Sequence, residues 1–190
     1  MSPSDHELWQ RLRGGEGEAL GELFERHAQS IYGYCFRMTG DPGAADELLS
    51  TTFLEVWRLR TKMPVPDDVR AWMFGVATNL GRNRRRALRR YRAFLEQLPQ
   101  LTDAAFVEDA GEMVVLRDET RKLLSSLSRL PQREREAALL VWCQGLSVEE
   151  AADALDVETG ALRTRLHRAR TRLRNELDSP SGKWRLAPDE

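Results

Sequence analysis

The sequence predicts an all-α protein of two helical modules joined by an acidic flexible linker. Apolar residues recur at spacings of three and four positions over several long segments, which is the period of an amphipathic helix. No segment between turn signals alternates between polar and apolar residues, as a half-buried strand would. An acidic stretch with little to support a core separates the helical segments into two groups.

The predicted modules span residues 5–96 and 121–177, with the linker at 97–120 and a disordered tail at 178–190. A chain of 190 residues is long enough for two domains with cores of their own. Charged residues make up 31% of the chain, but its formal net charge is only −1. The distribution of charge is therefore more informative than the total, because the arginines gather in two clusters. These clusters lie at 82–92 and 163–174.

Several functional classes find no support in the residues. The N-terminus lacks the basic and apolar pattern of a secretory signal, and no apolar stretch is long enough to span a membrane, so we expect a cytoplasmic protein without membrane insertion. Cys35 and Cys143 lie far apart in apolar stretches and predict buried free thiols. No paired carboxylates, metal-ligand cluster, nucleophile motif or phosphate loop is present, so we expect no cofactor, no metal and no enzymatic activity.

Four helices are predicted for the first module. The first covers residues 7–13 and ends at a glycine pair, and the second covers 18–38. On the second helix, His27 is interpreted as a helix-face or core histidine rather than a catalytic base, because no nucleophile or carboxylate partner is evident nearby. The predicted buried face of that helix comprises Leu20, Leu23, Phe24, His27, Ile31, Tyr34, Cys35 and Met38.

The third predicted helix, residues 44–62, follows a turn at Thr39–Gly43 and has two unlike faces. Its inner stripe is Ala45, Leu48, Leu49, Thr52, Phe53, Val56 and Trp57. Its other face shows Asp46, Glu47, Ser50, Thr51 and Glu55. That polar face is either a solvated surface or a docking surface for a basic partner.

A loop containing Pro64 and Pro66 precedes the fourth helix, residues 69–95, which Asp67 or Asp68 can cap. Its first half has an apolar face that includes Trp72, and its second half carries seven arginines. Such a charge density requires an anion, and the phosphate backbone of a nucleic acid fits better than a lipid surface, because no broad apolar face lies beside the arginines. The rest of the apolar face is Met73, Val76, Ala77 and Leu80.

The second module is predicted to contain helices at 114–127 and 132–144, followed by a helix-turn-helix from Leu146 to Leu177. Ser147 and Glu150 form a capping box at the start of the first helix of this motif, and Thr159 can cap the second. The second helix has an apolar stripe and an arginine-rich outer face, which suits a DNA major groove, although a solvated basic helix would have the same pattern. The stripe is Leu162, Leu166, Ala169 and Leu173.

Three stretches resemble one family, the bacterial RNA polymerase sigma factors of the extracytoplasmic-function (ECF, group IV) type. Residues 45–57 (ADELLSTTFLEVW) are similar to the family's core-binding region 2.2, and residues 70–86 (RAWMFGVATNLGRNRRR) to its regions 2.3–2.4. The stretch from Leu130 (LPQRERE) to Arg170 is similar to region 4. The order of the three stretches and the acidic linker also match.

This resemblance implies roles for individual residues. The acidic face of the helix at 44–62 would contact core RNA polymerase, through Asp46, Glu47, Ser50, Thr51 and Glu55. The loop Thr61–Asp68 would capture a base flipped from the melted minus-ten element of promoter DNA. The nearby strand would be held by Asn79, Arg82, Arg84, Arg85 and Arg86. The minus-thirty-five element would be read by Arg163, Thr164, Arg165 and Arg168. An anti-sigma factor is a further expected partner.

Two positions depart from the family pattern, Ala161 where a threonine is frequent and Asn83 where an aspartate is frequent, and they concern the promoter sequence rather than the fold. A conventional helix-turn-helix regulator that binds duplex DNA outside the polymerase remains the alternative function. It leaves the acidic face at 44–62 and the arginines at 82–92 without a role. The tryptophans at 57, 72 and 142 are predicted to pack in cores.

Overall fold

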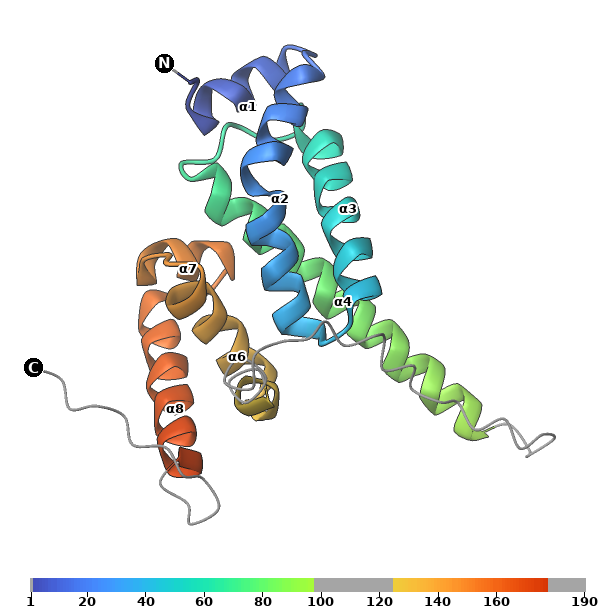
Figure 1. Cartoon of the computed structure of the whole chain (residues 1–190), viewed down its shortest axis with the longest axis vertical. Helices are drawn as coiled ribbons and strands as arrows, with labels where there is room; N and C mark the ends of the chain where they lie inside the picture. Colours follow the sequence, from blue (N-terminus) through green and yellow to red (C-terminus); the bar gives the residue numbers. More distant parts are fainter. Residues whose placement is uncertain (1, 98–124, 178–190) are drawn as a thin grey trace, which may run out of the picture. The chain divides into compact units, whose positions relative to one another are not determined.

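A computed structural model describes residues 2–97 and 125–177, and Figure 1 shows that these residues are helical. They contain no strand, which confirms the predicted all-α fold. They form two compact units, one on each side of the segment 98–124. Within these two ranges, no helix has both the length and the apolar character needed to cross a bilayer.

The first unit begins with α1, Asp5–Arg13, which starts two residues before the predicted helix. The cause is a capping box, in which the Ser4 hydroxyl accepts from the Glu7 backbone N–H and the Glu7 carboxylate accepts from the Ser4 backbone N–H. The bonds from the Ser4 backbone and hydroxyl lower the pKa of Glu7, since they stabilise its charged form. Leu8, Trp9 and Leu12 of α1 are fully buried.

Helix α2, Glu18–Thr39, packs against α1, α3 and α4 and forms the centre of this unit. Leu23, His27, Ile31, Tyr34 and Cys35 are buried as predicted. Phe24 is a wrong prediction: 43% of it is exposed, and its ring lies edge-on against Phe53 of α3 at 4.9 Å between centroids. Burial raises the pKa of the Cys35 thiol to about 12.

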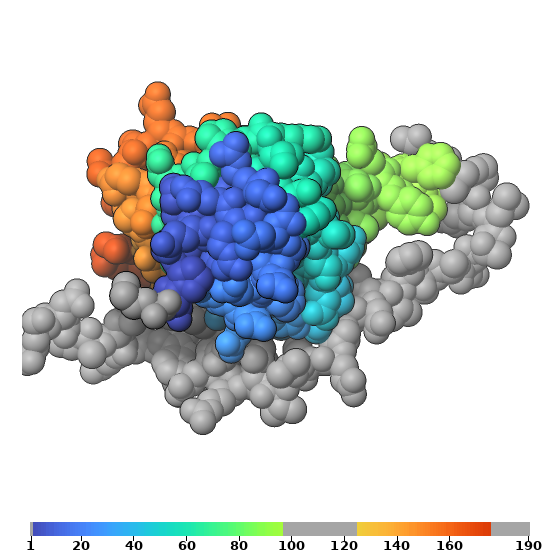
Figure 2. All heavy atoms as spheres, turned by 90° about the horizontal axis from the view of Figure 1, so that it is seen from above, coloured from blue at the N-terminus to red at the C-terminus, as the bar shows by residue number. Residues whose placement is uncertain are grey.

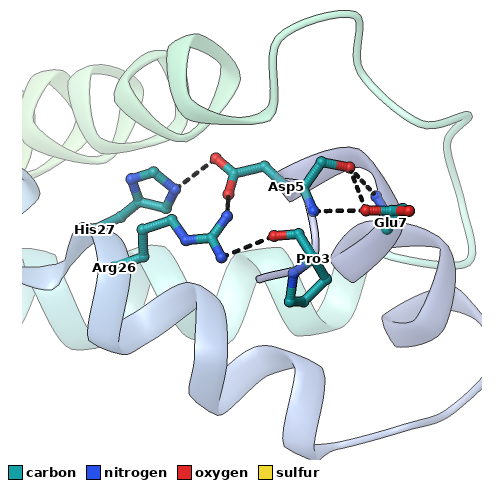
Figure 3. Close-up of polar contacts among 6 residues, drawn as sticks. Pro3, Asp5, Glu7, Arg26 and His27 are labelled. Carbon is teal, nitrogen blue, oxygen red and sulfur yellow. Dashed lines mark hydrogen bonds and ion pairs between the residues drawn. The ribbon is translucent and has the colours of Figure 1, made fainter. Parts of the chain in front are cut away.

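Asp5 joins α1 to α2 through two side chains of α2, as Figure 3 shows. Its carboxylate bonds the Arg26 guanidinium and lies 2.6 Å from Nε2 of His27, and Arg26 also donates to the Pro3 carbonyl. His27 is buried, as predicted, but the expectation that it lacks a carboxylate partner was wrong. Asp5 is 22 residues away in the sequence, so only the packing of α1 on α2 reveals the contact.

Helix α3, Pro42–Leu59, begins two residues before the prediction, because the Asp41 side chain caps it from outside and Pro42 fits the first turn. Gly40 ends α2 with a φ of 75°, which glycine adopts without strain. Helix α4, Val69–Gln97, is capped by Asp68, whose carboxylate accepts from the Ala71 backbone N–H at 2.7 Å. The predicted turn and cap signals therefore set the lengths of both helices.

The buried face of α4 is wider than its predicted apolar stripe, because the helix contacts α1, α2 and α3 together. Phe74 and Thr78, absent from the prediction, are fully buried. The Thr78 hydroxyl forms a 2.6 Å hydrogen bond with the Tyr34 hydroxyl of α2. Trp72 is only half-buried and lies edge-on to Trp9 at 4.9 Å.

In the second unit, residues 125–129 are helical, and α6, Gln132–Ala138, follows the predicted break at Pro131. The α-helix then gives way to a π-helical turn, η1, at Leu139–Cys143, where one continuous α-helix was expected. Trp142 and Cys143 are exposed there, so their predicted burial was wrong. Instead of packing in the core, the Trp142 ring lies 5.9 Å from the Arg170 guanidinium.

The helix-turn-helix comprises α7, Val148–Ala154, and α8, Thr159–Leu177. The predicted capping box is present, with Ser147 and Glu150 bonded to each other's backbone N–H groups. Asp156 turns the chain between the helices with a φ of 53°. Helix α8 already includes Thr159, so this residue is part of the first turn rather than the predicted cap. Leu162 and Ala169 of the predicted stripe are fully buried.

Candidate nucleic-acid interface

The arginine-rich half of α4 is the strongest candidate for a nucleic-acid surface. The buried Tyr34–Thr78 pair fixes α4 on α2 just before this segment begins. Beyond it, Asn79 and Arg86 are exposed, while Arg82, Arg84 and Arg85 are half-buried. This half of α4 extends past the ends of α2 and α3 (Figure 1). The structure thus displays a run of guanidinium groups on a helix held firmly at one end.

Local contacts orient several of these side chains. The Arg82 guanidinium donates to the Asn79 amide oxygen at 3.3 Å, and that of Arg86 donates to Asn83 one turn away. The two asparagines act as acceptors that hold the arginines along the helix surface. A side chain already held in place loses less conformational freedom when it binds a phosphate.

Contacts at the end of α3 fix the start of the loop that precedes α4. Helix α3 ends at Leu59, and the Arg60 guanidinium lies 3.5 Å from the centroid of the Trp57 ring. Arg60 also donates to the Trp57 carbonyl, so the end of α3 is held by a stacked pair. Asp68 closes the loop at its other end by capping α4. The segment between them, residues 61–68, lies beside the start of α4 and has no regular secondary structure.

The polar face of α3 lies where the sequence predicted it. Asp46, Glu47 and Ser50 are exposed, and Thr51 and Glu55 are half-buried. The carboxylate of Glu55 pairs with Arg58 through three hydrogen bonds, and this pairing raises the pKa of the guanidinium.

Sequence reasoning missed Leu54, which also lies on α3 and is 67% exposed. The sequence contained the relevant information, because an apolar residue outside the buried stripe of an amphipathic helix is a candidate contact residue. Leu54 is therefore an exposed apolar residue on the same helix as the acidic face of α3.

One ion pair joins the acidic face of α3 to the basic half of α4. The Nε of Arg84 lies 3.2 Å from Oε2 of Glu47, although the two residues are 37 positions apart. The sequence assigned these two side chains to different partners, so the structure links surfaces that were predicted separately.

The outer face of α8 presents a second set of cations. Arg163, Thr164 and Arg168 are exposed, and Arg165 is half-buried. Arg163 pairs with Glu149 of α7 at 2.9 Å, which braces the two helices of the motif. The Thr164 hydroxyl donates to the Gly160 carbonyl, which leaves its oxygen able to accept. On the inner side, Arg172 pairs with Glu134 of α6 at 3.0 Å.

Comparison with protein families matches both units. Residues 23–91 match sigma-70 region 2, and residues 120–173 match sigma-70 region 4. The RNA polymerase sigma factor CarQ of Myxococcus xanthus is 32% identical over 168 residues, covering 88% of this chain and 94% of CarQ. The ECF RNA polymerase sigma factor SigE of Mycolicibacterium smegmatis is 33% identical over 158 residues, covering 82% of this chain and 60% of SigE.

The chain belongs to the ECF sigma factors. Among solved structures, CnrH in complex with the cytosolic domain of CnrY is similar to it, with a TM-score of 0.70 and 26% identity. That match covers 94% of this chain and 99% of CnrH.

The predicted function is confirmed: this sigma factor is a promoter-specificity subunit of RNA polymerase that initiates transcription. The alternative, a helix-turn-helix regulator outside the polymerase, is not favoured. It would leave the region 2 match, which spans most of α2, α3 and α4, without a role.

Proposed function

We propose that the two units of this sigma factor divide promoter recognition between them. Residues 5–96 act as region 2 and open the minus-ten element, residues 121–177 act as region 4 and read the minus-thirty-five element, and residues 97–120 link them. The observation that carries this proposal is the arginine run on α4, held beside the loop 61–68. Melting a duplex costs a few kilocalories per mole for each unstacked base, and a surface that traps a base and grips phosphates can offset it.

In region 2, Arg82, Arg84, Arg85 and Arg86 hold phosphates of the melted strand, with Asn79 beside them. The loop 61–68 receives the extruded base. Helix α4 suits this task because the buried part fixes its position while the arginines stay accessible. Guanidinium groups bind phosphate oxygens in pairs, which gives position as well as charge.

The face of α3 that carries Asp46, Glu47, Ser50, Thr51 and Glu55 binds a basic surface of core polymerase. In region 4, α8 enters the major groove with Arg163, Thr164, Arg165 and Arg168 directed at base edges and phosphates. Their exposure on one helix supports this assignment.

Three further assignments follow from the family. We place this factor in group IV of the sigma factors, which its matches to regions 2 and 4 support. We expect it to act in the cytoplasm and without catalysis of its own, since the polymerase supplies the chemistry. An anti-sigma factor is a proposed partner, supported by CnrH, whose structure was solved with the cytosolic domain of CnrY.

The deciding experiment reverses the charge of Arg85 and Arg86 to Glu, with and without Arg84→Glu. Open-complex formation in run-off transcription with purified core polymerase should fall by at least tenfold, because attraction to phosphate becomes repulsion. Binding of the Arg85/Arg86 variant to core polymerase should be unchanged. A matched control, Arg13→Glu with Arg129→Glu, changes the net charge equally at exposed positions outside the proposed surfaces. Loss of core binding in the Arg85/Arg86 variant would show that α4 is a polymerase surface instead.

A further inference from the structure

The last turns of α4 expose apolar side chains beyond the packed part of the first unit. Figure 2 shows this end of the helix, in yellow-green, standing out from the rest of the unit. Leu88 is 40% exposed, Tyr91 51%, Phe94 58% and Leu95 37%. No other helix in residues 2–97 or 125–177 exposes four large apolar side chains so close together. A surface of this kind marks an interaction site.

These side chains form one continuous strip. With about 3.6 residues per turn, five of the six apolar residues at 87–95 fall within about a third of the helix circumference, and only Ala93 lies on the opposite side. We call this set the α4 strip: Ala87, Leu88, Tyr91, Phe94 and Leu95. Arg90 and Arg92 lie along its two edges, and Arg89 lies on the opposite side of the helix. The segment is therefore amphipathic, with an apolar side and a basic side, so the expectation from the sequence that no broad apolar face lies beside these arginines was wrong.

This arrangement discriminates between classes of partner. Nucleic acid would bind the basic side, because the strip offers no cation to a phosphate. A second copy of this chain would bring the arginine edges of two strips together, and like charges repel. Spacings of three, four and seven residues instead match the packing of one helix on another. The arginine edges then favour acidic side chains beside the partner's own apolar stripe.

We propose that the α4 strip is the docking site for an amphipathic helix of another protein, whose apolar stripe is bordered by aspartate or glutamate. This site goes beyond the promoter contacts proposed above. Of the proposed phosphate-binding arginines, Arg82, Arg85 and Arg86 lie outside the arc of the strip, whereas Arg84 lies on the same side one turn before Leu88. The partner therefore stays bound while Arg82, Arg85 and Arg86 hold DNA. The docked helix would cover Tyr91 and Phe94, whose rings supply the largest contact area of the strip.

A designed peptide tests this chemistry on the full-length protein. The probe is a fluorescent helical peptide with a leucine stripe bordered by glutamates, and its matched control has lysines in place of those glutamates. The glutamate peptide should bind at least tenfold more tightly than the lysine peptide. Tyr91→Ser should weaken that binding about tenfold, as removal of a central aromatic contact does. Trp142→Gln, which changes an exposed aromatic residue on the other unit, should leave it unchanged.

A charge swap makes the test specific. The double variant Arg90→Glu with Arg92→Glu should lose the glutamate peptide and gain the lysine peptide. Equal binding of both peptides, or binding that Tyr91→Ser does not alter, would overturn the proposal. A dimer in analytical sedimentation that dissociates on Tyr91→Ser would also overturn the proposal, since a second copy of this chain would then occupy the strip. An increase in peptide affinity on neutralising Asp103, Glu108, Asp109 and Glu112 would identify the chain's own linker as the occupant, and would overturn it as well.

Measurement with and without single-stranded promoter DNA separates this proposal from the assignment of the DNA surface. Peptide affinity should be the same in both conditions, which supports the two-sided arrangement. Competition between peptide and DNA would place both on one side of α4 and overturn simultaneous binding. Loss of DNA binding alone in Arg85→Glu with Arg86→Glu, with peptide binding retained, is the expected pattern for independent surfaces.

Discussion

Arg84 takes part in two surfaces at once. It lies in the arginine run of α4, but its Nε is 3.2 Å from Oε2 of Glu47 on the acidic face of α3. Its side chain is 31% exposed and that of Glu47 is 65% exposed, so solvent screens the pair and its net stabilisation is at most about 1 kcal/mol. If Arg84 binds phosphate and Glu47 binds a basic polymerase group, as proposed above, the phosphate must compete with Glu47 for Arg84, and the polymerase group would release Arg84 from Glu47.

This competition predicts the effect of Glu47→Gln. The variant should bind single-stranded minus-ten DNA about two- to fivefold more tightly than the parent in the absence of polymerase, because up to about 1 kcal/mol of competing attraction is removed. Fluorescence anisotropy with labelled DNA measures the change. Asp46→Asn is the control, since it removes the same charge from the neighbouring position. An equal gain in both variants would attribute the effect to overall charge rather than to the ion pair.

The ends of the helices are where local sequence had most influence on structure. The caps at Asp68 and Ser147 could be predicted, because a cap needs one side chain at a fixed distance from a backbone N–H. Asp41 was assigned only to the turn before α3, and its role as the cap of that helix was not predicted. The cap at Ser4 obeys the same rule, although the first helix was predicted to begin only at residue 7.

One such cap sets the start of the helix-turn-helix. Ser147→Ala should lower the free energy of unfolding of the second unit by about 1 kcal/mol, because the Glu150 N–H loses its acceptor. Urea unfolding followed by circular dichroism measures this change. Ser50→Ala, in the middle of α3, should alter stability by less than half as much. Equal losses in both variants would show that the effect is not due to the cap.

Tertiary packing explains which side chains are buried where the helical periodicity of the sequence did not predict it. The spacing of apolar residues predicted which face of each helix is buried. It did not predict how many other helices pack against that face. Helix α4 meets three others, so Phe74 and Thr78 are buried at the margin of its stripe. Phe24 has the right spacing for the core of α2 but lies at the edge of that core. No local signal in the sequence announced the π-helical turn at Leu139–Cys143.

At the scale of the whole molecule, the two units match different regions of the sigma factors. The matches to region 2 and region 4 fall on different units, with the segment 98–124 between the described ranges. The proposed contact residues of each unit were predictable from the sequence, because they form charged faces on predicted helices. The pair between Glu47 and Arg84 was not, because it depends on how α3 packs against α4.

If the two units act separately, substitutions in α8 should impair transcription only from promoters with an intact minus-thirty-five element. Arg165→Glu with Arg168→Glu should reduce transcription at least tenfold from a promoter with an intact minus-thirty-five element, because α8 would repel the duplex. Transcription from a template whose minus-thirty-five element is scrambled should be the same for the variant and the parent. Run-off assays on the paired templates measure both effects. A loss on the scrambled template as well would mean that these residues also support binding to the polymerase.

The π-helical turn at Leu139–Cys143 has a consequence for how the length of this chain can change. Such a turn is an α-helix that accommodates one additional residue as a local bulge. Removal of one residue there would restore a regular α-helix. Glu134 and Glu136, which are buried before the turn, and the helix-turn-helix after it would keep their faces. The turn therefore marks a position where a relative could differ by a single deletion and retain the same DNA-reading motif.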